Sequence, residues 1–256
     1  MLDDFRYEYY ESVDSTNTRI KERVHAGEDQ GLVISAGEQT AGKGRIGRKW
    51  QSPSHDSVAT SLLIKPDDIR IESIPTVTVI AAMAVRDALD RLYGLQGLIK
   101  WPNDIVIGGK KICGILTEME MRENKVWYVV VGIGVNVHNT SFPEDIAFKA
   151  TSVDLELQKT SGKSGHRSEI TQAIWESFKK YYNIFIKTQD MSGLKAEYES
   201  HLANIGERVR IESQADSYEA VACGITDRGE LIVQVDDEQR IISTGEVSVR
   251  GIYGYC

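Results

Sequence analysis

The sequence predicts an α+β protein in which a mixed β-sheet is flanked by helices and followed by a small C-terminal β-barrel. Two observations support this fold class. Short strand patterns alternate with longer amphipathic helical patterns as far as residue 203. The composition then changes at Asn204-Ile205-Gly206, after which only strands and turns are expected. We therefore expect two domains, a larger one at residues 1–203 and a small one at residues 204–256.

The elements of the larger domain follow from their periodicity. A helix is expected to begin within Asp14-Ser15-Thr16-Asn17, because these side chains favour the N-cap position and Ile20 and Val24 then share one face. The longest helix is expected at residues 73–93, where Gly94 ends it. The remaining expectations are strands at 32–36, 57–65 and 126–131, a β-hairpin at 105–120 that turns at Gly108-Gly109, and helices at 153–157, from Ser168 to Phe185 and at 192–202.

The C-terminal domain is predicted from five short strand patterns that lie close together in the chain. Turn signals separate them, among them Asp227-Arg228-Gly229 and Asp236-Asp237. Strands are expected at 208–212, 218–223, 231–235, 240–243 and 247–249. A barrel of this size is too small to be an enzyme by itself.

Composition limits the class of protein and its compartment. The chain has 256 residues, a formal net charge of −8 and three cysteines, Cys113, Cys223 and Cys256. An odd number of widely spaced cysteines indicates neither a disulfide framework nor a metal cluster, and a small buried hydrophobe is the expected role of Cys113. The N-terminus lacks the pattern of a signal peptide, and no apolar run is long enough to span a membrane. We expect a reduced, cytoplasmic protein.

A cationic, glycine-rich stretch, Gln39 to Trp50, is the strongest functional signal. It holds three glycines and four cations, namely Gly42, Gly44, Gly47, Lys43, Arg45, Arg48 and Lys49. Glycine allows close approach of the backbone to a ligand, and exposed N–H groups with Arg and Lys form a site for an anion. On an acidic chain this pattern favours a local phosphate or carboxylate site over a nucleic-acid surface. A solvated surface loop remains the alternative at this point.

Two common phosphate-binding motifs do not fit this stretch. The spacing Gly42-x-Gly44-x-x-Gly47 matches the dinucleotide fingerprint, but that motif needs a following helix and Pro53 disfavours one. A P-loop is excluded because no Gly-Lys-Ser/Thr closes the motif. The five histidines have no metal-ligand spacing, and no Ser-His-Asp arrangement with a nucleophile elbow is present.

Two further segments carry polar chemistry of the same kind. One is residues 100–111, in which Lys111 lies on a hairpin beside apolar residues and would place its charge on a substrate oxyanion. The other is the strand end Gly132-Ile133-Gly134-Val135-Asn136. Trp50 and Trp101 are candidates for stacking on a planar ring. The residues alone therefore predict an anion-handling, nucleotide-like site.

Five motifs, in this order, resemble those of the biotin–protein ligases, also called biotin–acetyl-CoA-carboxylase ligases. They are Ser15-Thr16-Asn17, residues 38–45, Lys100-Trp101-Pro102-Asn103-Asp104, residues 111–116 and residues 132–136. The ending, with Asp227-x-x-Gly229 and Gly245-Glu246-Val247, is similar to the small SH3-like domain of that family. The resemblance implies a catalytic domain like that of class II synthetases.

The resemblance also implies the reaction. The carboxylate of biotin attacks the α-phosphate of ATP to give biotinoyl-5′-AMP, and a lysine of a biotin carboxyl carrier domain then displaces AMP. It implies catalytic roles for Lys111, Arg48 and Asp104. It implies biotin-binding roles for Ser15, Thr16, Asn17, Gln39, Gly42, Lys43, Gly44, Arg45, Lys111 and Gly114. It implies nucleotide-binding roles for Arg45, Arg48, Trp50, Lys100, Asn103 and Asn136. Mg²⁺ is expected with ATP, and no set of protein metal ligands is expected.

The sequence departs from the family pattern in several places, and two alternative functions are left open. The catalytic motifs begin almost at residue 1, so we expect no DNA-binding helix-turn-helix and no DNA partner. No membrane partner is expected, because no apolar run is long enough to span a membrane. Lys43 stands where many members carry Arg, and Ser54-His55-Asp56-Ser57 replaces a more glycine-rich turn. A lipoate or octanoate transferase and a non-catalytic biotin-binding regulator are the alternatives. The sequence leaves the oligomeric state open, a homodimer included.

Overall fold

The computed structural model describes residues 1–2, 4–50, 55–66, 69–212, 216–244 and 248–251. Its larger sheet has seven strands, and the smaller has five. The larger sheet is mixed, as predicted, because β1 and β2 pair in parallel while the other neighbours pair antiparallel. Its order is β1 (Arg6–Val13), β2 (Leu32–Gln39), β3 (Ser57–Ile64), β7 (Lys125–Asn136), β6 (Lys110–Arg122), β5 (Asp104–Ile107) and β4 (Leu98–Lys100).

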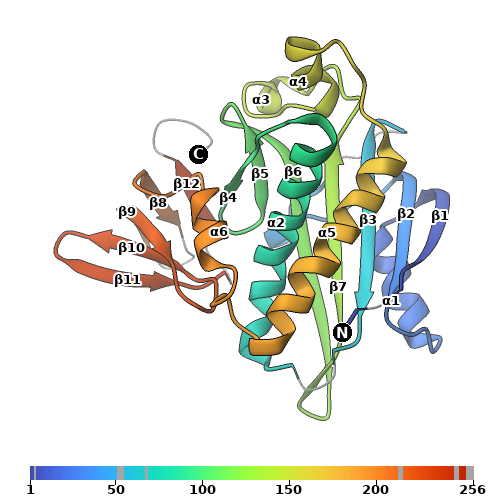
Figure 1. Cartoon of the computed structure of the whole chain (residues 1–256), viewed down its shortest axis with the longest axis horizontal. Helices are drawn as coiled ribbons and strands as arrows, with labels where there is room; N and C mark the ends of the chain where they lie inside the picture. The colour runs from blue at the N-terminus through green and yellow to red at the C-terminus, as the bar shows by residue number, and fades with distance from the viewer. Residues whose placement is uncertain (3, 51–54, 67–68, 213–215, 245–247, 252–256) are drawn as a thin grey trace.

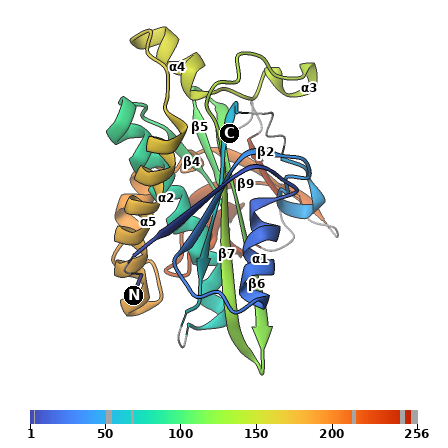
Figure 2. The same ribbon diagram turned by 90° about the vertical axis from the view of Figure 1, so that its right-hand side faces the viewer.

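Helices cover both faces of this sheet (Figures 1 and 2). The long helices α2 (Ile74–Tyr93) and α5 (Arg167–Thr188) pack side by side on one face, and α1 (Thr16–His25) covers the other. Successive residues of β3 therefore enter different cores: Leu62 packs under α2 and α5, and Leu63 packs under α1. Every residue of β3 is therefore buried, and the strand lies beneath the site with both faces covered.

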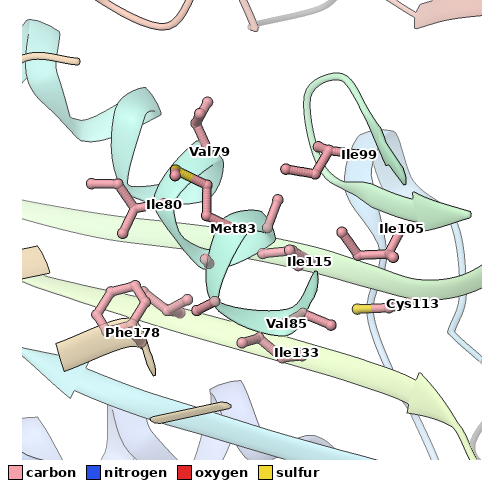
Figure 3. Close-up of a cluster of buried hydrophobic side chains, with 14 of the residues drawn as sticks. Val79, Ile80, Met83, Val85, Ile99, Ile105, Cys113, Ile115, Ile133 and Phe178 are labelled. Carbon is pink, nitrogen blue, oxygen red and sulfur yellow. The ribbon is translucent and has the colours of Figure 1, made fainter. Parts of the chain in front are cut away.

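The main core lies between α2, α5 and the sheet. Figure 3 shows part of this core, in which side chains of α2 form one buried cluster with residues of the sheet and of α5, among them Val85, Ile115, Ile133 and Phe178. The predicted helix ends as expected, because Gly94 adopts a left-handed conformation with φ 67°. Among the described residues, no helix is sufficiently long and apolar to cross a membrane.

The remaining helices match the predictions less closely. Helix α5 begins at Arg167 after the N-cap residue His166, one residue before the predicted start at Ser168. Helix α4 (Val153–Thr160) is capped by Ser152, whose Oγ accepts from the Leu155 N–H at 3.3 Å. The short helix α3 (Glu144–Ala147) was not predicted, and α6 (Lys195–Ser200) is shorter than expected.

All five predicted C-terminal strands are present in the second sheet, which is antiparallel throughout. They are β8 (Arg208–Glu212), β9 (Ser217–Ile225), β10 (Leu231–Val235), β11 (Glu238–Ile242) and β12 (Ser248–Gly251), in the order β11-β10-β9-β8-β12. Gln51, Ser52, Pro53, Ser54 and the motif Gly245-Glu246-Val247 lie outside the described residues.

The smaller sheet is tied to the larger one through the segment before β5. The Trp101 N–H donates to Asn204 Oδ1 and its indole Nε1–H donates to the carbonyl of Gly229, each at 2.8 Å. The chain after α6 also pairs with β4, since Ala203 N–H donates to the carbonyl of Ile99 at 2.8 Å. These bonds place the C-terminal sheet directly beside the segment Lys100–Asp104.

Candidate functional site

One cavity of about 870 Å³ opens between the two sheets and the glycine-rich loop. All of the predicted site residues line it except Gly42. Residues from four separate parts of the chain therefore meet: the start of α1, the loop at 43–50, the segment 100–104 with β6, and the end of β7. Residues of β12, Val249 and Gly251, complete the wall from the C-terminal domain.

The glycine-rich loop is folded back on itself. The backbones of Lys43 and Lys49 form an isolated antiparallel β-bridge. The Gly44 N–H donates to the carbonyl of Arg48 at 2.7 Å. Gly42 lies at the base, where its carbonyl accepts from Trp50 N–H at 3.0 Å and a Cβ would stand 2.4 Å from the Trp50 carbonyl oxygen. Gly42 is required by this close contact between the two arms of the loop.

A polar end of the cavity is built where α1 begins. Ser15 is the N-cap residue of α1 and is buried, as are Thr16 and Asn17. Gln39, at the end of β2, accepts at Oε1 from the Thr16 N–H at 2.8 Å and lies 3.1 Å from Thr16 Oγ1. Because Oε1 is held in this way, the amide Nε2 of Gln39 remains a donor for a ligand; no described protein group accepts from it.

Asn17 is held by the protein at both ends of its amide. Its Nδ2 donates to Glu118 Oε2 at 2.8 Å, and its Oδ1 accepts from Ser61 Oγ at 2.6 Å. The amide lies flat against Gly132, since a Cβ there would stand 2.2 Å from Asn17 Oδ1. Sequence analysis identified Gly132 only as part of a strand end; its role is to leave room for this amide.

A cationic end of the cavity faces the polar one. Lys111 Nζ lies 2.6 Å from Asp104 Oδ1 and 5.7 Å from the centre of the Trp50 ring. Lys100 is also buried at this end. Lysine, with its single compact charge, is suited to a substrate oxyanion in such a place.

Arg45 links the loop to two other parts of the wall. Its Nη1 donates to Asn103 Oδ1 at 3.1 Å, and its Nη2 donates to the carbonyl of Thr244 in the C-terminal domain. Burial lowers the pKa of the Arg45 guanidinium; the charge of Asp104 opposes this shift and that of Arg48 adds to it. Arg45 and Arg48 thus repel one another, and an anion bound between them relieves that repulsion.

Two glycines form the floor under Trp50. Gly114 of β6 and Gly134 of β7 are directly paired across the strands. A Cβ on Gly134 would lie 2.4 Å from Trp50 Cε2, and one on Gly114 would lie 3.0 Å from Trp50 Cζ3. The Nε1 of Trp50 is buried without a protein partner in the part of the chain that is described. The indole therefore rests on bare backbone, which only glycine at these two positions allows.

The segment that follows β7 forms a wall that the sequence did not predict. Lys111 N–H donates to the carbonyl of Lys149 at 2.8 Å, and the Thr151 N–H donates to the carbonyl of Lys111 at 2.9 Å. Asn136 is held against this segment, because its Nδ2 donates to the carbonyl of Thr151 at 3.0 Å. Phe148 also lines the cavity, with 70% of its surface exposed.

Two expectations for single residues have different outcomes. The prediction that Trp101 stacks on a ligand is wrong, because the residue is 1% exposed and its indole N–H donates a hydrogen bond to the carbonyl of Gly229.

Cys113 is buried among apolar residues, as expected, and burial raises the pKa of its thiol. It is therefore an inert core residue.

Residues 9–136 match the family described as biotin/lipoate A/B protein ligases, and residues 205–250 match the biotin protein ligase C-terminal domain. The chain belongs to the biotin/lipoate A/B protein ligase family. The first match contains the glycine-rich loop, Lys111 and the Gly132–Asn136 strand end, so this family membership covers most of the cavity wall.

Named relatives within the family are biotin ligases. The bifunctional ligase/repressor BirA of Bacillus spizizenii is 34% identical, with 94% of this chain and 73% of that protein covered. The biotin–[acetyl-CoA-carboxylase] ligase of Mycobacterium tuberculosis is 30% identical, with 91% and 85% covered. The biotin protein ligase of Aquifex aeolicus, solved in complex with biotin and ATP, superposes with a TM-score of 0.82 at 26% identity over 96% of this chain and 99% of that one.

Proposed function

We propose that this chain is an ATP-dependent biotin–protein ligase. It activates biotin as biotinoyl-5′-AMP and transfers biotin to a lysine of a biotin carboxyl carrier domain. The observation that carries the proposal is that one cavity of about 870 Å³ joins a polar end to a cationic end, which suits a neutral ring on one side and phosphates on the other. The proposal is supported by relatives that are named as ligase/repressors and by relatives that are named as ligases alone.

The polar end is proposed to take the ureido ring of biotin. A cyclic urea offers N–H donors beside a carbonyl acceptor. Gln39 Nε2 is placed to donate to that carbonyl, and the hydroxyls of Thr16 and Ser15 are placed to accept from N–H groups. Asn17 and Lys43 line the same end, and Gly42, Gly44 and Gly114 give the backbone around the bicyclic ring.

The cationic end is proposed to bring two anions together. A carboxylate must approach an α-phosphate, and like charges at such distances repel strongly in a site of low dielectric. Arg48 and Lys111 offset this repulsion, and they stabilise the charge that develops on the transferred phosphorus centre. The Arg45 guanidinium, fixed by Asn103, adds a second positive group close to Arg48.

The nucleotide is proposed to lie toward Trp50 and Asn136. Trp50 supplies a planar face over the glycine floor, and Asn136 supplies an amide carbonyl from the end of β7. Lys100 is proposed to contact phosphate from the floor of the same end.

Mg²⁺ accompanies ATP in this proposal. No described group of three or more His, Cys, Asp or Glu side chains is arranged to hold a metal by itself. Mg²⁺ is usually held by one or two carboxylates together with substrate phosphates, and the cavity offers Asp104 and Asp145. The donor set therefore fits Mg²⁺ delivered with ATP, where it would neutralise phosphate charge.

The partner and setting follow from the same proposal. The acceptor is the lysine of a carboxyl carrier domain, with Lys100 or Asp104 near its point of entry. We take residues 1–203 as the catalytic domain and 204–256 as the C-terminal domain, which the match at 205–250 supports. A cytoplasmic location, a homodimer and the absence of a DNA or membrane partner remain proposals.

A transfer assay tests the function. The purified chain is incubated with Mg²⁺-ATP and tritiated biotin, with and without a carboxyl carrier domain, and in parallel with labelled octanoate and a lipoyl domain. We expect label on the carrier that depends on ATP and biotin, and none on the lipoyl domain. Label from octanoate alone would replace this function with that of a lipoate-type transferase, and tight biotin binding without transfer would indicate a regulator.

A further inference from the structure

Ser61 lies directly behind the polar end of the cavity without lining it. It is on β3, and none of its surface is exposed. Its Oγ lies 2.6 Å from Asn17 Oδ1 and 2.7 Å from Thr16 Oγ1. One buried hydroxyl thus contacts the two residues that begin α1, and no motif in the sequence pointed to it.

The single hydroxyl proton of Ser61 is shared between two neighbouring oxygens. A hydroxyl carries one proton, so Ser61 cannot donate to both neighbours at once. Asn17 Oδ1 is an acceptor, and its identity is set from the other side, because Asn17 Nδ2 donates to the Glu118 carboxylate. Burial favours the neutral form of Glu118, but hydrogen bonds from Lys21 and Asn17 outweigh it and lower its pKa, so this carboxylate stays an acceptor.

The arrangement that gives both contacts a proton has one direction. The two hydroxyl protons are shared by three contacts, because Thr16 Oγ1 also lies 3.1 Å from Gln39 Oε1. If Ser61 donates to Asn17 Oδ1, its contact with Thr16 carries a proton only when the Thr16 hydroxyl donates to Ser61 Oγ. Gln39 Oε1 is within hydrogen-bond distance of the Thr16 hydroxyl at 3.1 Å, but it already accepts the Thr16 N–H at 2.8 Å and is satisfied without the hydroxyl proton. The remaining lone pairs of Thr16 Oγ1 then face the cavity as acceptors, beside the Gln39 Nε2 donor.

We propose that Ser61 is a positioning residue that sets the direction of the Thr16 hydroxyl, so that the polar end accepts a ligand N–H and donates to the adjacent carbonyl. The inference rests on the proposed function. It makes Ser61 a determinant of selectivity for a cyclic urea over acids of similar length that carry no N–H, such as octanoate. Ser61 pairs in the sheet with Gly132, the glycine that seats the Asn17 amide, so one register position supports both residues.

The test separates the two ends of the cavity. Ser61→Ala removes the hydroxyl, which frees the Thr16 proton to turn toward the cavity and leaves Asn17 Oδ1 without its donor. We expect the KM for biotin, and the Kd for biotin measured calorimetrically without ATP, to rise about tenfold, as for a lost hydrogen bond that leaves a buried acceptor unsatisfied. The KM for ATP and kcat should stay within about twofold of wild type.

A matched control uses the neighbouring residue. Thr60→Val removes a buried hydroxyl from the same strand, on the opposite face, where Thr60 Oγ1 accepts from Trp175 Nε1 at 3.0 Å. It should lower the unfolding midpoint without changing either KM. Ser61→Cys, which nearly keeps the volume but donates weakly, should raise the biotin KM at least about threefold even if Ser61→Ala does not fold.

The outcomes are distinct. An unchanged biotin KM in Ser61→Ala or Ser61→Cys overturns the inference, as does an equal rise in the biotin and ATP KM values, which would indicate general loosening. A wild-type protein that binds no biotin overturns the proposed function itself.

Discussion

At the scale of single residues, the charges of the site are held in defined partnerships. Lys111 is paired with Asp104, and Arg45 is shared between Asn103 and the carbonyl of Thr244. A cation held in place before substrate binds loses less freedom on binding, so its charge acts with little reorganisation. The same partnerships explain how an acidic chain concentrates positive charge in one cavity.

The proposed function predicts that Arg45 and Arg48 retain the acyl-adenylate. Arg48→Ala removes a charge-assisted contact worth about 1.5–3 kcal/mol, which is roughly tenfold or more in retention. We expect the variant to release biotinoyl-AMP and to label a bystander protein, while labelling of the carrier falls. Arg45→Ala should do the same and also weaken biotin binding, because it loosens the loop from Asn103. Blotting for biotin after incubation with a bystander checks this; a clean bystander lane with normal carrier labelling would mean that both arginines are ordinary surface charges.

At the scale of elements, the predictions from sequence succeeded where side chains carry the signal. Helix α2 and the hairpin of β5 and β6 follow from apolar spacing and from Gly94 and Gly108-Gly109. Strand β1 was missed because it is an edge strand, with most of its residues partly or fully exposed, and thus has no apolar stripe. Strand β4 has three residues, too few for a periodicity.

The candidate site was predicted in the same uneven way. Its cations and glycines were found because their residue types are unusual in sequence. The wall at Lys149 and Thr151 was not, because it contacts Lys111 through backbone groups that every residue has. Trp101 was misjudged because its partner, Gly229, is distant in the chain. Ser61 is one polar residue in a strand with other Ser and Thr residues, so only its neighbours in space distinguish it.

Two glycines of β7 lie against opposite ends of the cavity, Gly132 beneath Asn17 and Gly134 beneath Trp50. Gly132→Ala would push the Asn17 amide, and Gly134→Ala would push the Trp50 ring, since both added Cβ atoms lie under 3 Å from those groups. Overpacking of this kind costs about 1–3 kcal/mol. We expect Gly132→Ala to raise the KM for biotin about tenfold, and Gly134→Ala to raise the KM for ATP by a similar factor. Steady-state kinetics with each substrate varied in turn checks this, and a rise in the same KM for both variants would contradict the assignment.

At the scale of the whole molecule, the C-terminal domain takes part in the site. Thr244, Val249 and Gly251 contact the loop or line the cavity, and Trp101 joins the segment Lys100–Asp104 to Gly229. The C-terminal domain therefore contacts two walls of the cavity, the glycine-rich loop and the segment Lys100–Asp104. The small sheet is thus part of the wall of the cavity.

The charge of the whole chain leads to a prediction about DNA. With a net charge of −8, the protein gains little from counterion release on a phosphate backbone. We expect no sequence-specific DNA binding in the presence of biotin and ATP, although some named relatives are ligase/repressors. A mobility-shift assay on a biotin-operon fragment over a range of salt concentrations checks this. A salt-dependent shift would refute it.

Lys111 is proposed to stabilise the charge that develops during adenylate formation, in a cavity that holds biotin and ATP together. Biotin-dependent exchange of labelled pyrophosphate into ATP measures that step without the carrier. We predict exchange only when biotin is present, a reduction of about 10²–10³-fold in Lys111→Ala, and a wild-type rate in Lys110→Ala, the neighbouring lysine that does not line the cavity. Exchange without biotin would contradict adenylate formation from biotin, and a wild-type rate in Lys111→Ala would contradict the role of Lys111.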